Sequence, residues 1–135
     1  MNIADSIAGR EVLVMFCDRT ELPWLRMLRP GFRHCFLALR DTGRWIIYEP
    51  YSNRTVISVA EPASGFDLPA FFSGLGCTVV QTRLAPTPSR PAPWAPYTCV
   101  EAVKRVMGIR SRWIVTPWQL FQHLTKNMNN NLETD

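Results

Sequence analysis

Apolar residues recur along the chain in five short runs that are separated by polar or turn-forming residues. Runs of about four to eight residues, rich in β-branched and aromatic side chains, predict β-strands. The runs span residues 11–17, 34–40, 45–49, 55–59 and 77–84. The polar sequence DTGR at 41–44 predicts a hairpin turn between the second and third of them.

Four other segments have apolar residues at helical spacing and carry helix start or stop signals. They span residues 21–28, 68–75, 99–107 and 117–126. Five prolines within residues 85–96 predict a stiff, extended connector. Residues 112–115 are expected to form a short strand or an extended link, and the polar residues 127–135 a frayed tail.

Length and composition fit one folded domain over residues 1–135. The chain is 47% apolar, which is enough to build a core, and its length is typical of a single domain. Five predicted strands that form one antiparallel sheet, packed against the later helices, predict an α+β fold. We expect an antiparallel sheet made from the five strands to pack against the later helices.

The charge of the chain is mildly basic, with 15 Lys and Arg against 11 Asp and Glu, a net charge of +4. The arginines are scattered, with no run of like charge, so nucleic-acid binding ranks last among the functions considered. No C-x-x-C pair occurs, and we expect neither a metal nor another cofactor. No signal peptide or membrane span is predicted, so the expected compartment is the cytoplasm.

Cys99 occupies an unusual place for a structural cysteine. Thr98 and Glu101 form a T-x-x-E capping box, so Thr98 is the predicted N-cap and Cys99 the first helical residue. The start of a helix carries partial positive charge and unpaired N–H groups. A thiolate is stabilised there, so the pKa of Cys99 should fall. This placement predicts a nucleophile, with Cys17 as the rival candidate.

A base for this nucleophile comes from the predicted hairpin. A tight turn at 41–42 pairs His34 with Glu49, and a longer loop shifts the partner by two residues but keeps both side chains on one face. A carboxylate beside an imidazole fixes its tautomer and raises its basicity. Cys99, His34 and Glu49 together make a candidate Cys–His–Glu triad. The other histidine, His123, is expected on the exposed surface of the last helix.

Each member of this triad also has a purely structural interpretation. A strand histidine often binds a backbone carbonyl, a glutamate before a proline is usually solvated, and a cysteine at a helix start can be plain packing. Cys35 alternates to the face opposite His34 and is expected in the core, as is Cys77. The coincidence of the three residues makes us favour the catalytic interpretation.

The segments FRHCFLALRDTGRWIIYEPYSNRTVISV and PYTCVEAVKRVMGI, followed by TPWQLFQHL, carry a resemblance to a known family. The order of His34 on a strand, Glu49 on the next strand and Cys99 at a helix start resembles the circularly permuted papain-like hydrolases. These are permuted relatives of the NlpC peptidases, and they include the YiiX-like bacterial proteins and lecithin:retinol acyltransferase. The likeness covers about residues 31–126. The bulky RHCF sequence departs from the small residues usual after that histidine, which leaves the substrate class open.

The resemblance implies a function and roles for these residues. Cys99 would be the nucleophile, His34 the general base and then acid, and Glu49 the residue that orients the imidazole. The Cys99 backbone N–H would contribute to an oxyanion hole, and Tyr97 or Trp94 would line the cleft. The implied activity is that of an amidase or peptidase acting on a peptide, amide or ester substrate such as a cell-wall peptide, with lipid acyl transfer as a variant.

The chain also resembles short proteins encoded by tailed phages and prophages. On that likeness, an alternative to the enzyme is a catalytically silent papain-like protein that serves as a structural or interaction component of a virion. The expected location would then be the virion and not the cytoplasm.

Overall fold

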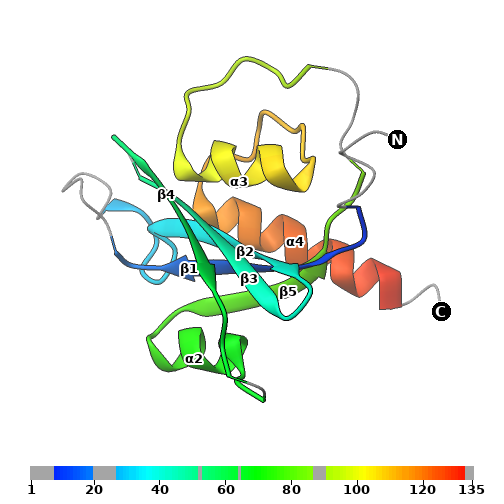
Figure 1. Ribbon diagram of the computed structural model, residues 1–135. Coiled ribbons are helices and arrows are strands. Elements are labelled where there is room, and N and C mark those ends of the chain that lie inside the picture. The colour runs from blue at the N-terminus through cyan, green and yellow to red at the C-terminus, as the bar shows by residue number, and fades with distance from the viewer. Residues whose placement is uncertain (1–7, 20–26, 52, 64, 87–90, 133–135) are drawn as a thin grey trace.

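The computed structural model describes residues 8–19, 27–51, 53–63, 65–86 and 91–132. Within these residues, one five-stranded antiparallel sheet packs against three helices (Figure 1). The strands are β1 Glu11–Cys17, β2 His34–Asp41, β3 Arg44–Pro50, β4 Thr55–Ala60 and β5 Thr78–Arg83. The helices are α2 Leu68–Gly74, α3 Cys99–Met107 and α4 Pro117–Leu132. The predicted α+β class is confirmed, and every predicted strand end lies within one residue of the observed end.

The sheet separates two apolar clusters because strand side chains alternate between its faces. Its strand order is β4-β3-β2-β1-β5. On β1, Val12, Val14 and Phe16 pack with apolar residues of α3 and α4. Leu13 and Met15 pack on the other face with α2. Figure 1 shows this arrangement, with α3 and α4 on one side of the sheet and α2 on the other.

The hairpin between β2 and β3 turns one residue later than the predicted turn at 41–42, which shifts each pairing partner by two residues. Asp41 pairs with Arg44, so the turn residues are Thr42 and Gly43, and Ala38 pairs with Ile47 instead of Trp45. Both turn residues have positive φ, 46° and 69°, as a type I′ turn requires. Gly43 adopts such a conformation without a steric cost, which explains why the turn is centred there.

The helices differ from their predicted extents in several places. The last helix, α4, continues to Leu132, so most of the expected tail at 127–135 is helical. Residues 112–115 form a turn and loop and no strand. Helix α2 ends at Gly74, with Leu75 and not Gly76 as its C-cap. The helix predicted over 21–28 lies mostly outside the described residues.

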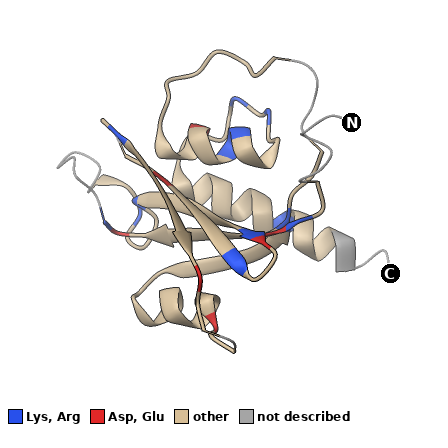
Figure 2. Ribbon diagram, viewed as in Figure 1, with Lys and Arg blue, Asp and Glu red and all other residues tan. Residues whose placement is uncertain are grey.

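Charged residues are distributed over the described surface. Figure 2 shows the Lys and Arg residues at separate places, several of them beside acidic residues. Arg10 pairs with Asp41 at 2.7 Å, and Arg40 pairs with Glu11 at 3.2 Å. The described part of the chain therefore presents no continuous basic stripe of the kind that tracks a phosphate backbone.

Candidate active site

Helix α3 begins as the sequence predicts, with Thr98 as its N-cap and Cys99 as its first residue. The Glu101 backbone N–H donates a hydrogen bond of 3.3 Å to Thr98 Oγ1. Gly108 ends the helix in the left-handed conformation, with φ of 75°. Cys99 therefore lies where the helix carries its partial positive charge.

Only one half of the predicted capping box forms. The Glu101 carboxylate does not bind the Thr98 N–H; it accepts hydrogen bonds from Lys104 Nζ at 3.1 Å and Arg105 Nε at 3.2 Å. Lys104 is buried, and it also donates to the Ile114 carbonyl. A buried ammonium group needs a counter-ion more than an exposed backbone N–H needs a cap, which explains the exchange of partners.

His34 and Glu49 are brought together, as the hairpin predicts. His34 Nε2 lies 3.4 Å from Glu49 Oε1, and their side chains are only 8% and 15% exposed. Continuing the observed register places Glu49 opposite Phe36, diagonal to His34, and places Tyr51 directly opposite His34. The His34 and Tyr51 rings are stacked, with centroids 5.5 Å apart. The pairing therefore shifts by two residues while the shared face is kept.

The Cys99 thiol is the one acidified cysteine among the four. Its pKa is lowered from 9.0 to about 5, most strongly by a hydrogen bond with the Cys35 side chain. Burial opposes this effect, and hydrogen bonds with the His34 side chain and the Cys35 backbone add to it. The protein thus holds Cys99 as a thiolate at neutral pH, in contact with an imidazole whose Nε2 faces Glu49.

The pKa values of the other three cysteines are raised and not lowered. Burial raises the pKa of Cys17 to about 11, and it also raises the pKa of Cys77. The pKa of Cys35, which is fully buried as predicted, lies well above its usual value of 9.0 because of burial and its contact with Cys99. Cys17 is therefore the weaker candidate for a nucleophile. Cys77, which we expected in the core, is only half-buried and lies at the margin of the core.

The three candidate residues converge at the end of the sheet where β2 begins and β3 ends. Cys99 packs against the cluster on the α3 face. Glu49 lines a cavity of about 430 Å³ on the α2 face, with Phe36, Ile47 and Phe72 as its apolar neighbours. His34 is the first residue of β2, so its ring lies at the margin of the sheet and contacts groups from both faces.

Two polar residues that surround Glu49 were not predicted from the sequence. Arg19 Nη1 lies 3.8 Å from Glu49 Oε1, and the Arg19 side chain also hydrogen-bonds Tyr51. The Tyr51 hydroxyl in turn hydrogen-bonds Glu49, and burial raises its pKa. Tyr51 lies two residues beyond Glu49, so the correct hairpin register would have pointed to it. Arg19 follows β1, and no sequence pattern distinguishes it.

Tyr97 and Trp94, which were predicted to line the cleft, and His123, which was expected on the surface, have contacts of their own. The Tyr97 hydroxyl hydrogen-bonds the Tyr48 hydroxyl at 2.8 Å. Trp94 is exposed and lines a cavity of about 490 Å³ that also touches Thr98. His123 is half-buried on α4, and its Nε2 lies 3.2 Å from the Asn127 side chain.

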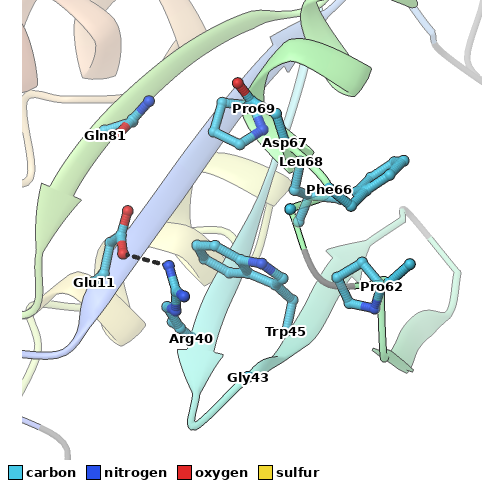
Figure 3. A pocket seen from close by; sticks show the side chains of 12 residues that line it. Glu11, Arg40, Gly43, Trp45, Pro62, Phe66, Asp67, Leu68, Pro69 and Gln81 are labelled. Atoms are coloured by element: carbon cyan, nitrogen blue, oxygen red, sulfur yellow. Dashed lines mark hydrogen bonds and ion pairs between the residues drawn. The ribbon is translucent and has the colours of Figure 1, made fainter.

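A larger cavity, of about 750 Å³, lies at the opposite end of the same strands. Figure 3 shows the paired Glu11 and Arg40 on one side of it, beside the Trp45 ring, with Asp67 and Pro69 across from them. Neither a cysteine nor a histidine lines this cavity. This cavity therefore offers no thiol or imidazole.

Comparison with protein-family models, with curated proteins and with solved structures finds no match to this chain. Across the described ranges, no three His, Cys, Asp or Glu side chains are grouped as a metal ion would require. No helix in the described part of the chain is long and apolar enough to cross a membrane.

Proposed function

We propose that this chain is a cysteine-dependent hydrolase of the permuted papain-like kind, acting as an amidase or peptidase. The observation that carries the proposal is the acidified Cys99 thiol in contact with His34, whose Nε2 is 3.4 Å from Glu49. A nucleophile, a base and a group that orients the base are the three parts of a catalytic triad. Their order along the chain, His34, Glu49 and then Cys99, supports the permuted arrangement.

The proposed reaction is acyl transfer in two halves. The Cys99 thiolate attacks the substrate carbonyl carbon, and the oxyanion that forms lies near the free N–H groups at the start of α3. As the C–N or C–O bond breaks, the imidazolium of His34 gives its proton to the leaving group. Water then attacks the thioester while His34 takes its proton, which releases the acid and restores the thiolate.

Glu49 would act on His34 and not on the substrate. Its carboxylate beside Nε2 holds the ring plane, while the stacked Tyr51 ring restricts tilting. Arg19 would hold the carboxylate in turn. The substrate class we propose is a peptide, amide or ester, with a cell-wall peptide as the first to be tried.

The test is to trap the acyl-enzyme. Incubation with an activated ester should add one acyl group to the tryptic peptide that spans residues 84–104, and hydroxylamine should remove it. The Cys99→Ala variant should lose both the adduct and turnover, and the matched control Cys77→Ala should keep both. An adduct that forms equally on every cysteine, or turnover that survives in Cys99→Ala, would refute the proposal.

A second function is supported by the edge of the sheet. Among the described residues, strand β4 pairs with β3 on one side and with no strand on the other, and its Ile57 and Val59 side chains are 66% and 58% exposed. An apolar edge strand is suited to pairing with another chain. The alternative is therefore a catalytically silent interaction component of a phage virion, which predicts no acyl-enzyme with any substrate tried.

A further inference from the structure

The buried Cys35 thiol contacts the proposed nucleophile, and the proposed acyl transfer does not use it. Cys35 is the second residue of β2, next to His34, and it is fully buried in the apolar cluster on the α3 face, against which Cys99 packs. Both its thiol and its backbone N–H hydrogen-bond the Cys99 sulfur. An apolar side chain would fill the same core position, so a second sulfur at this contact calls for a chemical explanation.

We propose that Cys99 and Cys35 form a peroxide-oxidisable dithiol in which Cys35 resolves the oxidised state of Cys99. The Cys99 thiolate attacks the terminal oxygen of a hydroperoxide, the O–O bond breaks, and Cys99 becomes a sulfenic acid while hydroxide or alkoxide leaves and takes a proton from the solvent to give water or an alcohol. The Cys35 sulfur then attacks the Cys99 sulfur. The S–O bond breaks, the Cys35 proton goes to the departing hydroxide, and a disulfide and one water result.

The arrangement of the two residues suits each step. A thiolate is the form that reacts with peroxide, and Cys99 is held as one at neutral pH. Only Cys99 needs to meet the oxidant, since the resolving sulfur already contacts it from the core. The disulfide shields Cys99 from further oxidation to the irreversible sulfinic acid, and a low-molecular-weight thiol restores both sulfurs.

The other two cysteines form a separate pair. Phe16 pairs with Thr78 between β1 and β5, so the same register places Cys17 opposite Cys77. These two thiols are hydrogen-bonded to each other, and both line the cavity on the α2 face. The sulfenic acid at Cys99 therefore has Cys35 as its neighbouring thiol, and Cys17 and Cys77 can be replaced without touching the proposed pair.

The experiment uses the full chain carrying Cys17→Ser and Cys77→Ser, so that only the proposed pair remains. Treatment with hydrogen peroxide, alkylation of free thiols and tryptic mapping without reductant should reveal peptide 34–40 linked to peptide 84–104. Dithiothreitol should release both peptides. Adding Cys35→Ser, which keeps the size and a hydrogen-bond donor, should raise trapping of the Cys99 sulfenic acid by dimedone about tenfold and lead to sulfinic acid.

The inference is overturned if Cys99 reaches sulfinic acid at the same peroxide dose with and without Cys35, or if no 34–40/84–104 linkage forms. Should the Cys35→Ser variant fail to fold, as circular dichroism would show, the peptide map of the chain that retains Cys35 decides alone. The inference shares Cys99 with the proposed function, but the two fail separately. Disulfide formation requires no substrate, and acyl-enzyme trapping is done in reductant.

Discussion

The lowered pKa of Cys99 can be tested directly by its rate of alkylation as the pH is changed. Iodoacetamide reacts with the thiolate, so the rate for each cysteine follows its thiolate fraction. The pKa of Cys99 is about 5, whereas that of Cys17 is about 11. Cys17 is therefore a reference thiol within the same molecule, with its pKa displaced in the other direction.

The expected ratio of rates follows from these two values. At about pH 6 the thiolate fraction of Cys99 exceeds that of Cys17 about 10⁵-fold. A less basic thiolate is also a weaker nucleophile, and a Brønsted slope of about 0.4–0.5 over six pKa units reduces the advantage about 250- to 1,000-fold. Cys99 should therefore react about 100- to 400-fold faster at about pH 6, and the preference should vanish near pH 8 and reverse above it.

The assay is pulsed alkylation of the folded chain at each pH followed by peptide mapping, with the guanidinium-unfolded chain measured separately as the reference for an ordinary thiol. The rate for Cys99 should rise through about pH 5 and then stay level. His34→Gln should move this midpoint upward, because the hydrogen bond with His34 helps to lower the pKa. A Cys99 midpoint near its ordinary 9.0, or equal rates for Cys99 and Cys17 at about pH 6, would refute the reasoning.

Four further predictions concern the proposed triad, the stability contribution of Cys99, the core and the β2–β3 turn. Glu49→Gln should lower kcat about 10²- to 10⁴-fold without unfolding the chain, measured by turnover of an activated ester beside circular dichroism. Cys99 should stabilise the fold fully above pH 9.0 and lose this contribution as pH falls towards about 5, because its folded pKa lies below the unfolded value. As the pH is lowered through that window, the urea midpoint of the wild type should therefore fall relative to that of Cys99→Ser. Midpoints of the two chains that change in parallel with pH would contradict the lowered pKa. Leu120→Ala, at a fully buried position, should cost about 2–5 kcal/mol in urea unfolding, whereas Leu75→Ala, at a position 62% exposed, should cost less than about 0.5 kcal/mol. Thr42→Asn should raise the free energy of unfolding by about 1 kcal/mol, because Asn tolerates the positive φ of 46° better than a β-branched residue; an unchanged or lower value would count against the type I′ turn.

The strands were predictable because each is a short apolar run closed by a turn residue. Strand β1 illustrates this, since all of Val12 to Phe16 is buried and its predicted and observed bounds agree. The end of α4 was not predictable in this way. Residues 127–132 are mostly asparagine and lack an apolar stripe, and they continue the helix from the packed turns before them. Propensity alone gives no reason for that extension.

The candidate site shows the same division between local and tertiary information. The Thr98 cap and the shared face of His34 and Glu49 depend on local spacing, and both are found in the structure. The exact hairpin register depended on which residues adopt positive φ, and the sequence DTGR permits more than one choice. The contact between Cys35 and Cys99 joins residues far apart in the chain, and no spacing argument reaches it.

The buried atoms at the site give a reason to regard the arrangement as functional and not only structural. Among the described residues, His34 Nε2 and Glu49 Oε1 are buried with no well-aligned hydrogen bond, although they lie 3.4 Å apart. A buried polar group left in this condition costs about 1–3 kcal/mol, a cost that a fold selected only for stability has no reason to keep. The cost falls when the imidazole carries a second proton, because the carboxylate then faces a charged donor. That is the state which follows proton transfer from a thiol to His34, so the geometry favours the ion pair needed for acyl transfer.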